Sequence, residues 1–128
     1  MPELNRILHV EDDPSIQAIA RLALEAVGGF EVLTCSNGQQ ALEQLPAFAP
    51  DFILLDVMMP GMDGPQTLSH ITQMLDINKV PVAFMTAKVQ PAEVAHYRSL
   101  GARDVIIKPF DPMQLAAQVR QIWSQSHE

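Results

Sequence analysis

Residues 52–61 read Phe52-Ile53-Leu54-Leu55-Asp56-Val57-Met58-Met59-Pro60-Gly61, so a short, continuously apolar run ends directly in an aspartate. Two later runs share this character, Val82-Ala83-Phe84-Met85 and Val105-Ile106-Ile107. Continuous apolar runs of this length are typical of parallel strands that helices cover on both faces. The stretch therefore predicts a buried parallel strand with a carboxylate at its carboxyl end.

Short runs of this kind alternate five times with longer segments of helical period. We predict strands over Arg6–Val10, Glu31–Cys35, Phe52–Leu55, Val80–Met85 and Val105–Ile107. The mixed Glu31–Thr34 segment suits an edge strand. Right-handed crossovers place the intervening helices on both faces of such a sheet. The fold class predicted for residues 1–128 is therefore a single α/β domain with a doubly wound, five-stranded parallel sheet.

The boundaries of several helices can be predicted from capping residues and prolines. Asp13-Pro14 indicates an N-cap and a first helical residue, and Asp111-Pro112 indicates the same for the last helix, with Gln114 as a capping-box partner. The second helix is predicted from about Gly38 to Leu45, before Pro46. The buried face of the first helix is predicted to comprise Ile16, Ile19, Ala20, Ala23 and Val27.

Composition excludes several functional classes. The chain has 15 acidic and 8 basic residues and a formal net charge of −7, and it lacks the clustered cations that would bind nucleic acid directly. The single cysteine, Cys35, excludes an intrachain disulfide and a thiolate zinc cluster. No apolar stretch is long enough to insert into a membrane, and no secretory signal is present. We expect a cytoplasmic location.

Polar residues directly follow four of the predicted strands. These residues are Glu11-Asp12-Asp13, Asp56, Thr86 and Lys108-Pro109. The carboxyl ends of parallel strands share one edge of a sheet, so these side chains should converge. Crowded carboxylates must raise a pKa or bind a cation, and Mg²⁺ prefers such oxygen ligands. An ionised aspartate beside Mg²⁺ can attack phosphorus, with a lysine and a hydroxyl neutralising the phosphoryl oxygens. We assign Asp13 to capping the first helix.

Four segments occur together in an order and spacing that identify a family. They are Ile7-Leu8-His9-Val10-Glu11-Asp12, then residues 50–64, then Pro81-Val82-Ala83-Phe84-Met85-Thr86-Ala87, and finally Gly101-Ala102-Arg103-Asp104 with Lys108-Pro109-Phe110. From about Leu4 to Trp123 the chain resembles the receiver domain of two-component response regulators, of the stand-alone chemotaxis type. The resemblance implies a flavodoxin-like sheet with strand order 2-1-3-4-5.

The same resemblance implies a role for each residue at the strand ends. Asp56 would be the phospho-acceptor, Thr86 the switch hydroxyl and Lys108 the phosphate-pairing lysine, with a cis peptide bond between Lys108 and Pro109. The implied Mg²⁺ ligands are Asp12 and Asp56 directly, Glu11 through water, and the backbone carbonyl of Met58. Mn²⁺ could replace Mg²⁺.

The resemblance also implies partners. A histidine kinase or phosphotransfer protein would donate the phosphoryl group, and a protein target would bind the face formed by the fourth helix, fifth strand and fifth helix. The sequence ends with the fifth helix, so we expect a stand-alone module, monomeric or weakly dimeric, that catalyses only its own phosphorylation and dephosphorylation. At Val105, where family members often carry an inward-turning Tyr or Phe, this chain has no aromatic ring to complete the usual relay from Thr86.

Other functions remain as alternatives. A phosphohydrolase of the haloacid dehalogenase type would need a second aspartate two residues after the nucleophile, where this chain has Met58. A flavodoxin-like or dinucleotide-binding domain would need a glycine-rich phosphate loop, which is absent. A receiver that binds its partner without phosphorylation is compatible with Val105. His9 is expected to be a packed, hydrogen-bonded residue and not a metal ligand.

Overall fold

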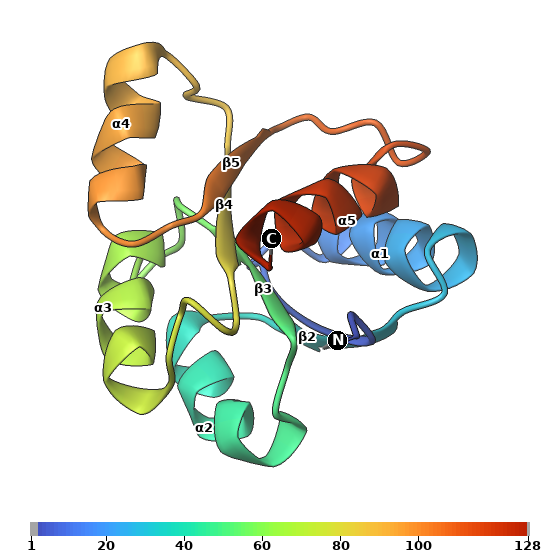
Figure 1. Cartoon of the computed structure of the whole chain (residues 1–128), viewed down its shortest axis with the longest axis horizontal. Coiled ribbons are helices and arrows are strands. Elements are labelled where there is room, and N and C mark those ends of the chain that lie inside the picture. The colour runs from blue at the N-terminus through green and yellow to red at the C-terminus, as the bar shows by residue number, and fades with distance from the viewer. Residues whose placement is uncertain (1–2, 128) are drawn as a thin grey trace.

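The computed structural model describes residues 3–127, which form a parallel sheet flanked by helices (Figure 1). The strands are β1 (Arg6–Val10), β2 (Glu31–Cys35), β3 (Phe52–Asp56), β4 (Val82–Thr86) and β5 (Asp104–Ile107). The helices are α1 (Pro14–Leu22), α2 (Gly38–Phe48), α3 (Gly64–Met74), α4 (Pro91–Ser99) and α5 (Leu115–Ser126), and a π-helical turn, η1 (Ala23–Val27), continues α1. All strand pairs are parallel and the order is β2-β1-β3-β4-β5, which confirms the predicted doubly wound, flavodoxin-like sheet.

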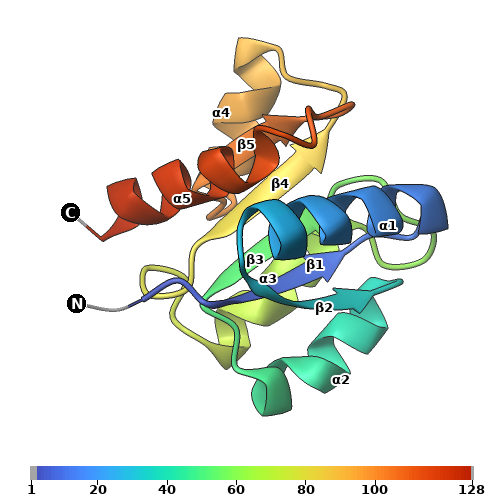
Figure 2. The same ribbon diagram turned by 90° about the vertical axis from the view of Figure 1, so that its right-hand side faces the viewer.

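The helices form a layer on each face of the sheet. Figures 1 and 2 show α1 and α5 on one face and α2, α3 and α4 on the other. Successive strand residues point to opposite faces, so each strand contributes to two cores. Leu54 of β3 packs in the core under α1 and α5, whereas its neighbour Ile53 packs in the core under α2 and α3.

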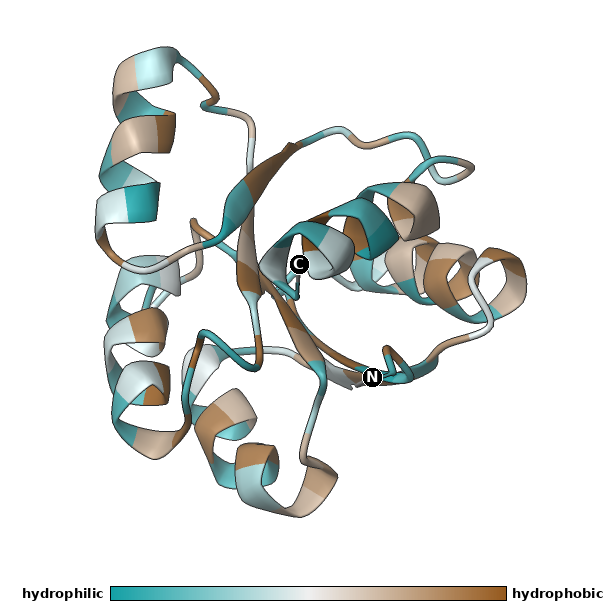
Figure 3. Cartoon of the chain, in the orientation of Figure 1, coloured by the Kyte–Doolittle hydropathy of each residue, from teal (hydrophilic) through white to brown (hydrophobic). Residues whose placement is uncertain are grey.

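Hydropathy follows this arrangement. Every residue of β3 and β4 is buried, whereas β2 mixes buried and exposed residues. Because β2 is the first strand in the sheet order, the prediction that Glu31–Thr34 lies in an edge strand is confirmed. In Figure 3 the central strands are largely brown, and the helices change between brown and teal along each turn. No helix within residues 3–127 has both the length and the apolar character needed to cross a membrane.

The N-terminus of α1 is capped as predicted, but its buried face is not the predicted one. Asp13 Oδ1 accepts a hydrogen bond of 2.8 Å from the backbone N–H of Ser15. Ile19 and Val27 are 47% and 50% exposed, so the prediction was wrong for both. The π-helical turn explains Val27: Gly28 N–H donates to the carbonyl oxygen of Ala23, five residues earlier. One extra residue per turn brings Gly28 inward in place of Val27.

Two other helix boundaries differ from the sequence prediction. Helix α2 continues through Pro46 to Phe48; a proline there removes only one helical hydrogen bond, and Leu45 and Phe48 still pack on the core. Helix α5 begins at Leu115, because the segment after Asp111 forms a preceding turn. In that turn Asp111 Oδ1 accepts a hydrogen bond from Met113 N–H, and no capping bond from the Gln114 side chain is present among the described residues.

Candidate functional site

The parallel topology brings the predicted site residues to one edge of the sheet. Glu11 and Asp12 follow β1, Asp56 is the last residue of β3, Thr86 is the last residue of β4, and Lys108 follows β5. They line one cavity of about 300 Å³ at the carboxyl ends of the strands. The complete lining is Glu11, Asp12, Asp13, Ile16, Asp56, Met58, Thr86, Ala87, Lys88 and Lys108. Positions as distant in sequence as 12 and 108 therefore share one site.

Three carboxylates in this cavity lie close enough to share a cation. One oxygen from each of Glu11, Asp12 and Asp56 lies within 4.8 Å of the other two. Glu11 and Asp56 are buried, with 1% and 3% of their surface exposed, whereas Asp12 is exposed. An all-oxygen donor set that is buried on one side and open on the other suits a hard divalent cation that retains some of its water ligands. The residues present therefore fit Mg²⁺.

Lys108 places a positive charge between two of the carboxylates. Its Nζ donates hydrogen bonds to Glu11 Oε1 at 2.8 Å and to Asp56 Oδ1 at 3.1 Å. Burial alone would lower the pKa of this ammonium group, but the two carboxylates outweigh that effect and raise the pKa above its ordinary value. The group is therefore held cationic. The Lys108–Pro109 peptide bond is cis, the isomer that the sequence resemblance implies.

The carboxyl group of Glu11 has a raised pKa. Burial raises its pKa to about 7; the hydrogen bond from Lys108 opposes the shift, and the negative charge of Asp56 adds to it. Its Oε2 also accepts a hydrogen bond of 3.2 Å from the backbone N–H of Asp13. The negative charges of Glu11 and Asp56 repel each other, and a cation bound between them would reduce this repulsion.

Thr86 and the adjoining loop form another wall of the cavity. The Thr86 side chain is buried, and its Oγ1 accepts a hydrogen bond of 3.1 Å from the backbone N–H of Lys88. Met58 also lines the cavity, with 67% of its surface exposed. That its carbonyl group is a metal ligand stays a prediction.

Val105 occupies the position at which members of the family often carry an aromatic residue. It pairs in register with Phe84 of β4 and packs, partly buried, against the core under α3 and α4. Residues paired in register on parallel strands point to the same face, so Val105 is a side neighbour of Phe84. Phe84 in turn contacts Tyr97 of α4, an aromatic residue that the sequence reasoning did not identify.

His9 corrects one expectation. The ring is completely buried as predicted, but neither ring nitrogen has a hydrogen-bond partner among the described residues. Burial, assisted by the Lys108 charge, lowers the pKa of His9 to about 4. Of its register neighbours, Leu54 in β3 has no hydrogen-bonding group in its side chain, and the hydroxyl oxygen of Thr34 in β2 is likewise without a partner among the described residues.

Gly64 lies against the backbone of the site, a role that was not predicted from the sequence. A Cβ built on Gly64 would lie 2.5 Å from the carbonyl oxygen of Asp56 and 2.8 Å from Cα of Val57. Only glycine therefore lets α3 begin directly against the end of β3. The available signal was its place after Asp63, which caps α3 in a capping box with Gln66.

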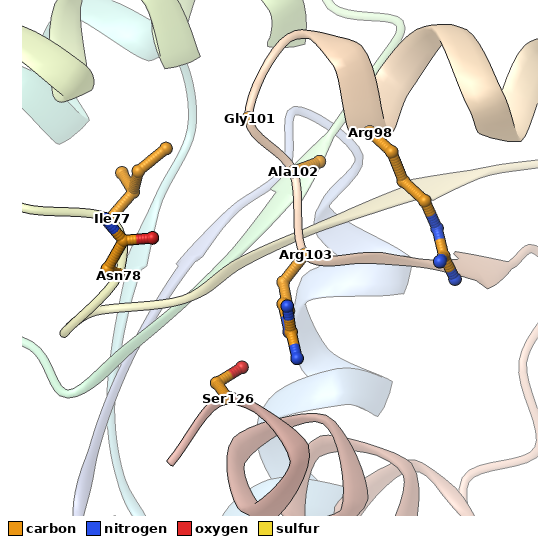
Figure 4. Close-up of a pocket in the computed structure, with 7 residues that line it drawn as sticks. All are labelled: Ile77, Asn78, Arg98, Gly101, Ala102, Arg103 and Ser126. Carbon is orange, nitrogen blue, oxygen red and sulfur yellow. The ribbon is translucent and has the colours of Figure 1, made fainter. Parts of the chain in front are cut away.

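A second cavity of about 330 Å³ lies at the amino ends of the strands, away from these carboxylates (Figure 4). Its two arginines already have partners: Arg98 pairs with Asp104 at 3.2 Å, and Arg103 donates to the carbonyl oxygen of Gln125 at 2.9 Å. Neither the charge nor the lining of this cavity provides the group-transfer chemistry of the carboxylate site.

Comparison with known proteins agrees with this geometry. A family model described as "Response regulator receiver domain" matches residues 7–120. The transcriptional regulatory protein CseB of Streptomyces avermitilis is 38% identical over 122 residues, which cover 95% of this chain and 50% of CseB. The DNA-binding response regulator MtrA of Mycolicibacterium smegmatis is 37% identical over 116 residues, covering 90% of this chain and 49% of MtrA. The chain thus spans about half the length of these curated relatives.

Solved structures show the same similarity. The chemotaxis protein CheY4 of Vibrio cholerae aligns with a TM-score of 0.86 and 26% sequence identity, covering 94% of this chain and 99% of that chain. A putative response regulator from Chloroflexus aurantiacus aligns with a TM-score of 0.84 and 29% identity, covering 95% and 99% of the two chains.

Proposed function

This chain belongs to the response regulator receiver domain family, the signalling domain of two-component systems, and from that premise we propose that Asp56 accepts a phosphoryl group in a Mg²⁺-dependent reaction. The observation that carries the proposal is the cavity in which Glu11, Asp12 and Asp56 lie within reach of one cation while Lys108 bonds two of them. We propose that residues 1–128 form one receiver domain.

Five side chains and one backbone carbonyl group of the cavity have a task in the transfer. A carboxylate oxygen of Asp56 attacks the phosphorus atom, forming an O–P bond as the bond between phosphorus and the donor's leaving group breaks. Lys108 pairs with a phosphoryl oxygen, and Thr86 donates its hydroxyl hydrogen to another. Glu11, Asp12, Asp56 and the Met58 carbonyl would hold Mg²⁺ or Mn²⁺. The bound ion would neutralise charge on the phosphoryl group.

The partners follow from this chemistry. A histidine kinase or phosphotransfer protein supplies the phosphoryl group in the cytoplasm. A protein target binds the face formed by α4, β5 and α5. Ile107 of β5 supports this face, because it is a large apolar side chain with 48% of its surface exposed. The stand-alone, monomeric or weakly dimeric arrangement stays a prediction, since the curated relatives are about twice as long as this chain.

Phosphorylation can be tested with a small acyl phosphate as donor. We expect the protein with Mg²⁺ to gain one phosphoryl mass, and hydroxylamine to remove it, because acyl phosphates are cleaved by that nucleophile. Asp56→Asn should gain none. Asp13→Asn is the matched control: it changes a carboxylate that lines the same cavity, keeps a good N-cap residue, and should be phosphorylated like the wild type.

The same experiment separates the alternatives. Absence of a hydroxylamine-sensitive adduct on the wild type, or an equal adduct on Asp56→Asn, would reject Asp56 as the acceptor. A receiver that acts without phosphorylation would show no adduct and would keep its target binding in Asp56→Ala. Turnover of many equivalents of a phosphate ester would instead indicate a phosphohydrolase.

A further inference from the structure

Helix α4 is attached to the sheet through a single aromatic side chain. Among the residues of α4, Tyr97 alone is buried, with 8% of its surface exposed. Its ring meets the ring of Phe84 edge to face, with centroids 5.2 Å apart and an interplanar angle of 66°. Such pairs contribute beyond the area that they bury. The position of α4 therefore depends on this contact more than on any other residue of the helix.

Phe84 connects Tyr97 to the acceptor site. Phe84 is completely buried in β4, two residues before Thr86 and on the same face of the strand. A Cβ on Gly64 would lie 3.1 Å from Cε1 of Phe84 and 2.5 Å from the Asp56 carbonyl oxygen. The Phe84 ring thus lies beside the start of α3, which itself lies against the backbone of Asp56.

The strand next to Phe84, β5, places no aromatic ring beside it. Its register partner in β5 is Val105, whose β-branched side chain has a restricted torsion angle and no aromatic surface. Val105 and Tyr97 belong to the same core cluster as Phe84. The aromatic partner of Phe84 therefore comes from α4 and not from β5.

We propose that Tyr97 is a positioning residue that couples α4 to the state of Asp56, because its contact with Phe84 fixes the point about which α4 tilts. This inference rests on the proposed phosphorylation of Asp56. At present Thr86 Oγ1 accepts a hydrogen bond from Lys88 N–H. When the hydroxyl turns to the phosphoryl group, that bond is released, residues 87–90 are freed to shift, and α4 tilts about the Tyr97 ring.

The aromatic ring, and not the hydroxyl group, carries this role. No hydrogen bond among residues 3–127 involves the Tyr97 hydroxyl oxygen, whereas the ring contacts both Phe84 and, at a centroid distance of 5.9 Å, His96. Tyr97→Phe should therefore preserve the coupling, and Tyr97→Leu should remove it while keeping an apolar side chain of adequate size.

The sequence contains one tyrosine, so tyrosine-labelled protein gives ring resonances from Tyr97 alone. We expect these resonances to shift when Mg²⁺ and acyl phosphate are added to the wild type, and to stay unchanged in Asp56→Asn. A wild type that is phosphorylated by intact mass but leaves the resonances unmoved would overturn the role of Tyr97. A wild type that gains no phosphoryl mass would overturn the proposed function, and this inference with it.

Hydrogen exchange over α4 tests the coupling itself. Before phosphorylation, Tyr97→Leu should exchange roughly two- to tenfold faster over residues 91–100 because the ring pair is lost. It should still gain the phosphoryl mass but lose the phosphorylation-dependent change in α4 exchange. Tyr97→Phe and Ala95→Leu, the latter at an exposed position of α4, should respond like the wild type. A full α4 response in phosphorylated Tyr97→Leu would contradict the proposal.

Discussion

His9 places a titratable ring in the core of the central part of the sheet. Its pKa is lowered to about 4, from an ordinary value of 6.5, so between these pH values the unfolded chain binds a proton that the folded chain does not. Lowering the pH therefore reduces the free energy of unfolding. The part due to His9 should be about 2 kcal/mol between pH 7.5 and pH 5.

The His9 contribution can be isolated with His9→Leu. Glu11 shifts stability in the opposite direction over part of the same range, because burial raises its pKa to about 7. Urea unfolding of both proteins at pH 7.5 and pH 5 cancels the Glu11 effect in the difference. We expect the wild type to lose about 2 kcal/mol more than His9→Leu on acidification. Equal losses in the two proteins would show that the buried ring gains its proton freely in the folded state.

At the scale of elements, two adjacent aspartates at the N-terminus of α1 have different roles: Asp13 caps the helix, and Asp12 belongs to the acceptor site. Asp13 accepts hydrogen bonds from Ser15 N–H and Ile16 N–H, whereas Asp12 contributes its oxygen to the carboxylate cluster. Asp13→Ala should lower the free energy of unfolding by about 1 kcal/mol and leave phosphorylation by acyl phosphate intact.

Asp12→Ala should do the reverse. Its stability should stay within about 0.5 kcal/mol of the wild type, while Mg²⁺-dependent phosphorylation is lost. Urea unfolding and intact mass, measured on both variants, check the pair. If both variants lost stability and neither lost phosphorylation, the division of roles between the two aspartates would be wrong.

Elements whose signals are local could be predicted from the sequence. The predicted strand ends at Val10, Cys35 and Ile107 were correct, and β3 and β4 each extend one residue further, to Asp56 and Thr86. At the other end, β4 begins two residues later than predicted, at Val82, and β5 begins one residue earlier, at Asp104. The capping role of Asp13 is equally local, because an N-cap needs only its own helix.

Features that depend on contacts between elements could not be predicted in this way. The π-helical turn at Ala23–Val27, the continuation of α2 through Pro46 and the burial of Tyr97 each arise where a helix adjusts to the sheet beneath it. Periodicity assumes one regular helix and does not include that adjustment. The positions of the site residues could be predicted because parallel topology alone brings strand ends together.

At the scale of the whole molecule, the acceptor site concentrates charge in a chain that already has a net charge of −7. Folding brings three carboxylates together, and Lys108 compensates only Glu11 and Asp56 directly. The unfolded chain has no such cluster. A cation that binds the folded state alone must therefore stabilise it by RT ln(1 + c/Kd), where c is the cation concentration, so the stabilisation rises with the logarithm of c once c exceeds the dissociation constant Kd.

Mg²⁺ at about 100 times its dissociation constant should raise the free energy of unfolding by about 2.7 kcal/mol, which corresponds to roughly 8 °C in melting temperature for a domain of this size. Thermal unfolding monitored by circular dichroism, with NaCl at equal ionic strength as the control for screening, measures the effect. Asp12→Asn should lose most of the increase, because it removes one charged ligand and part of the repulsion. An equal increase in both proteins would mean that Mg²⁺ acts on the overall negative charge and that the carboxylate cluster is not its binding site.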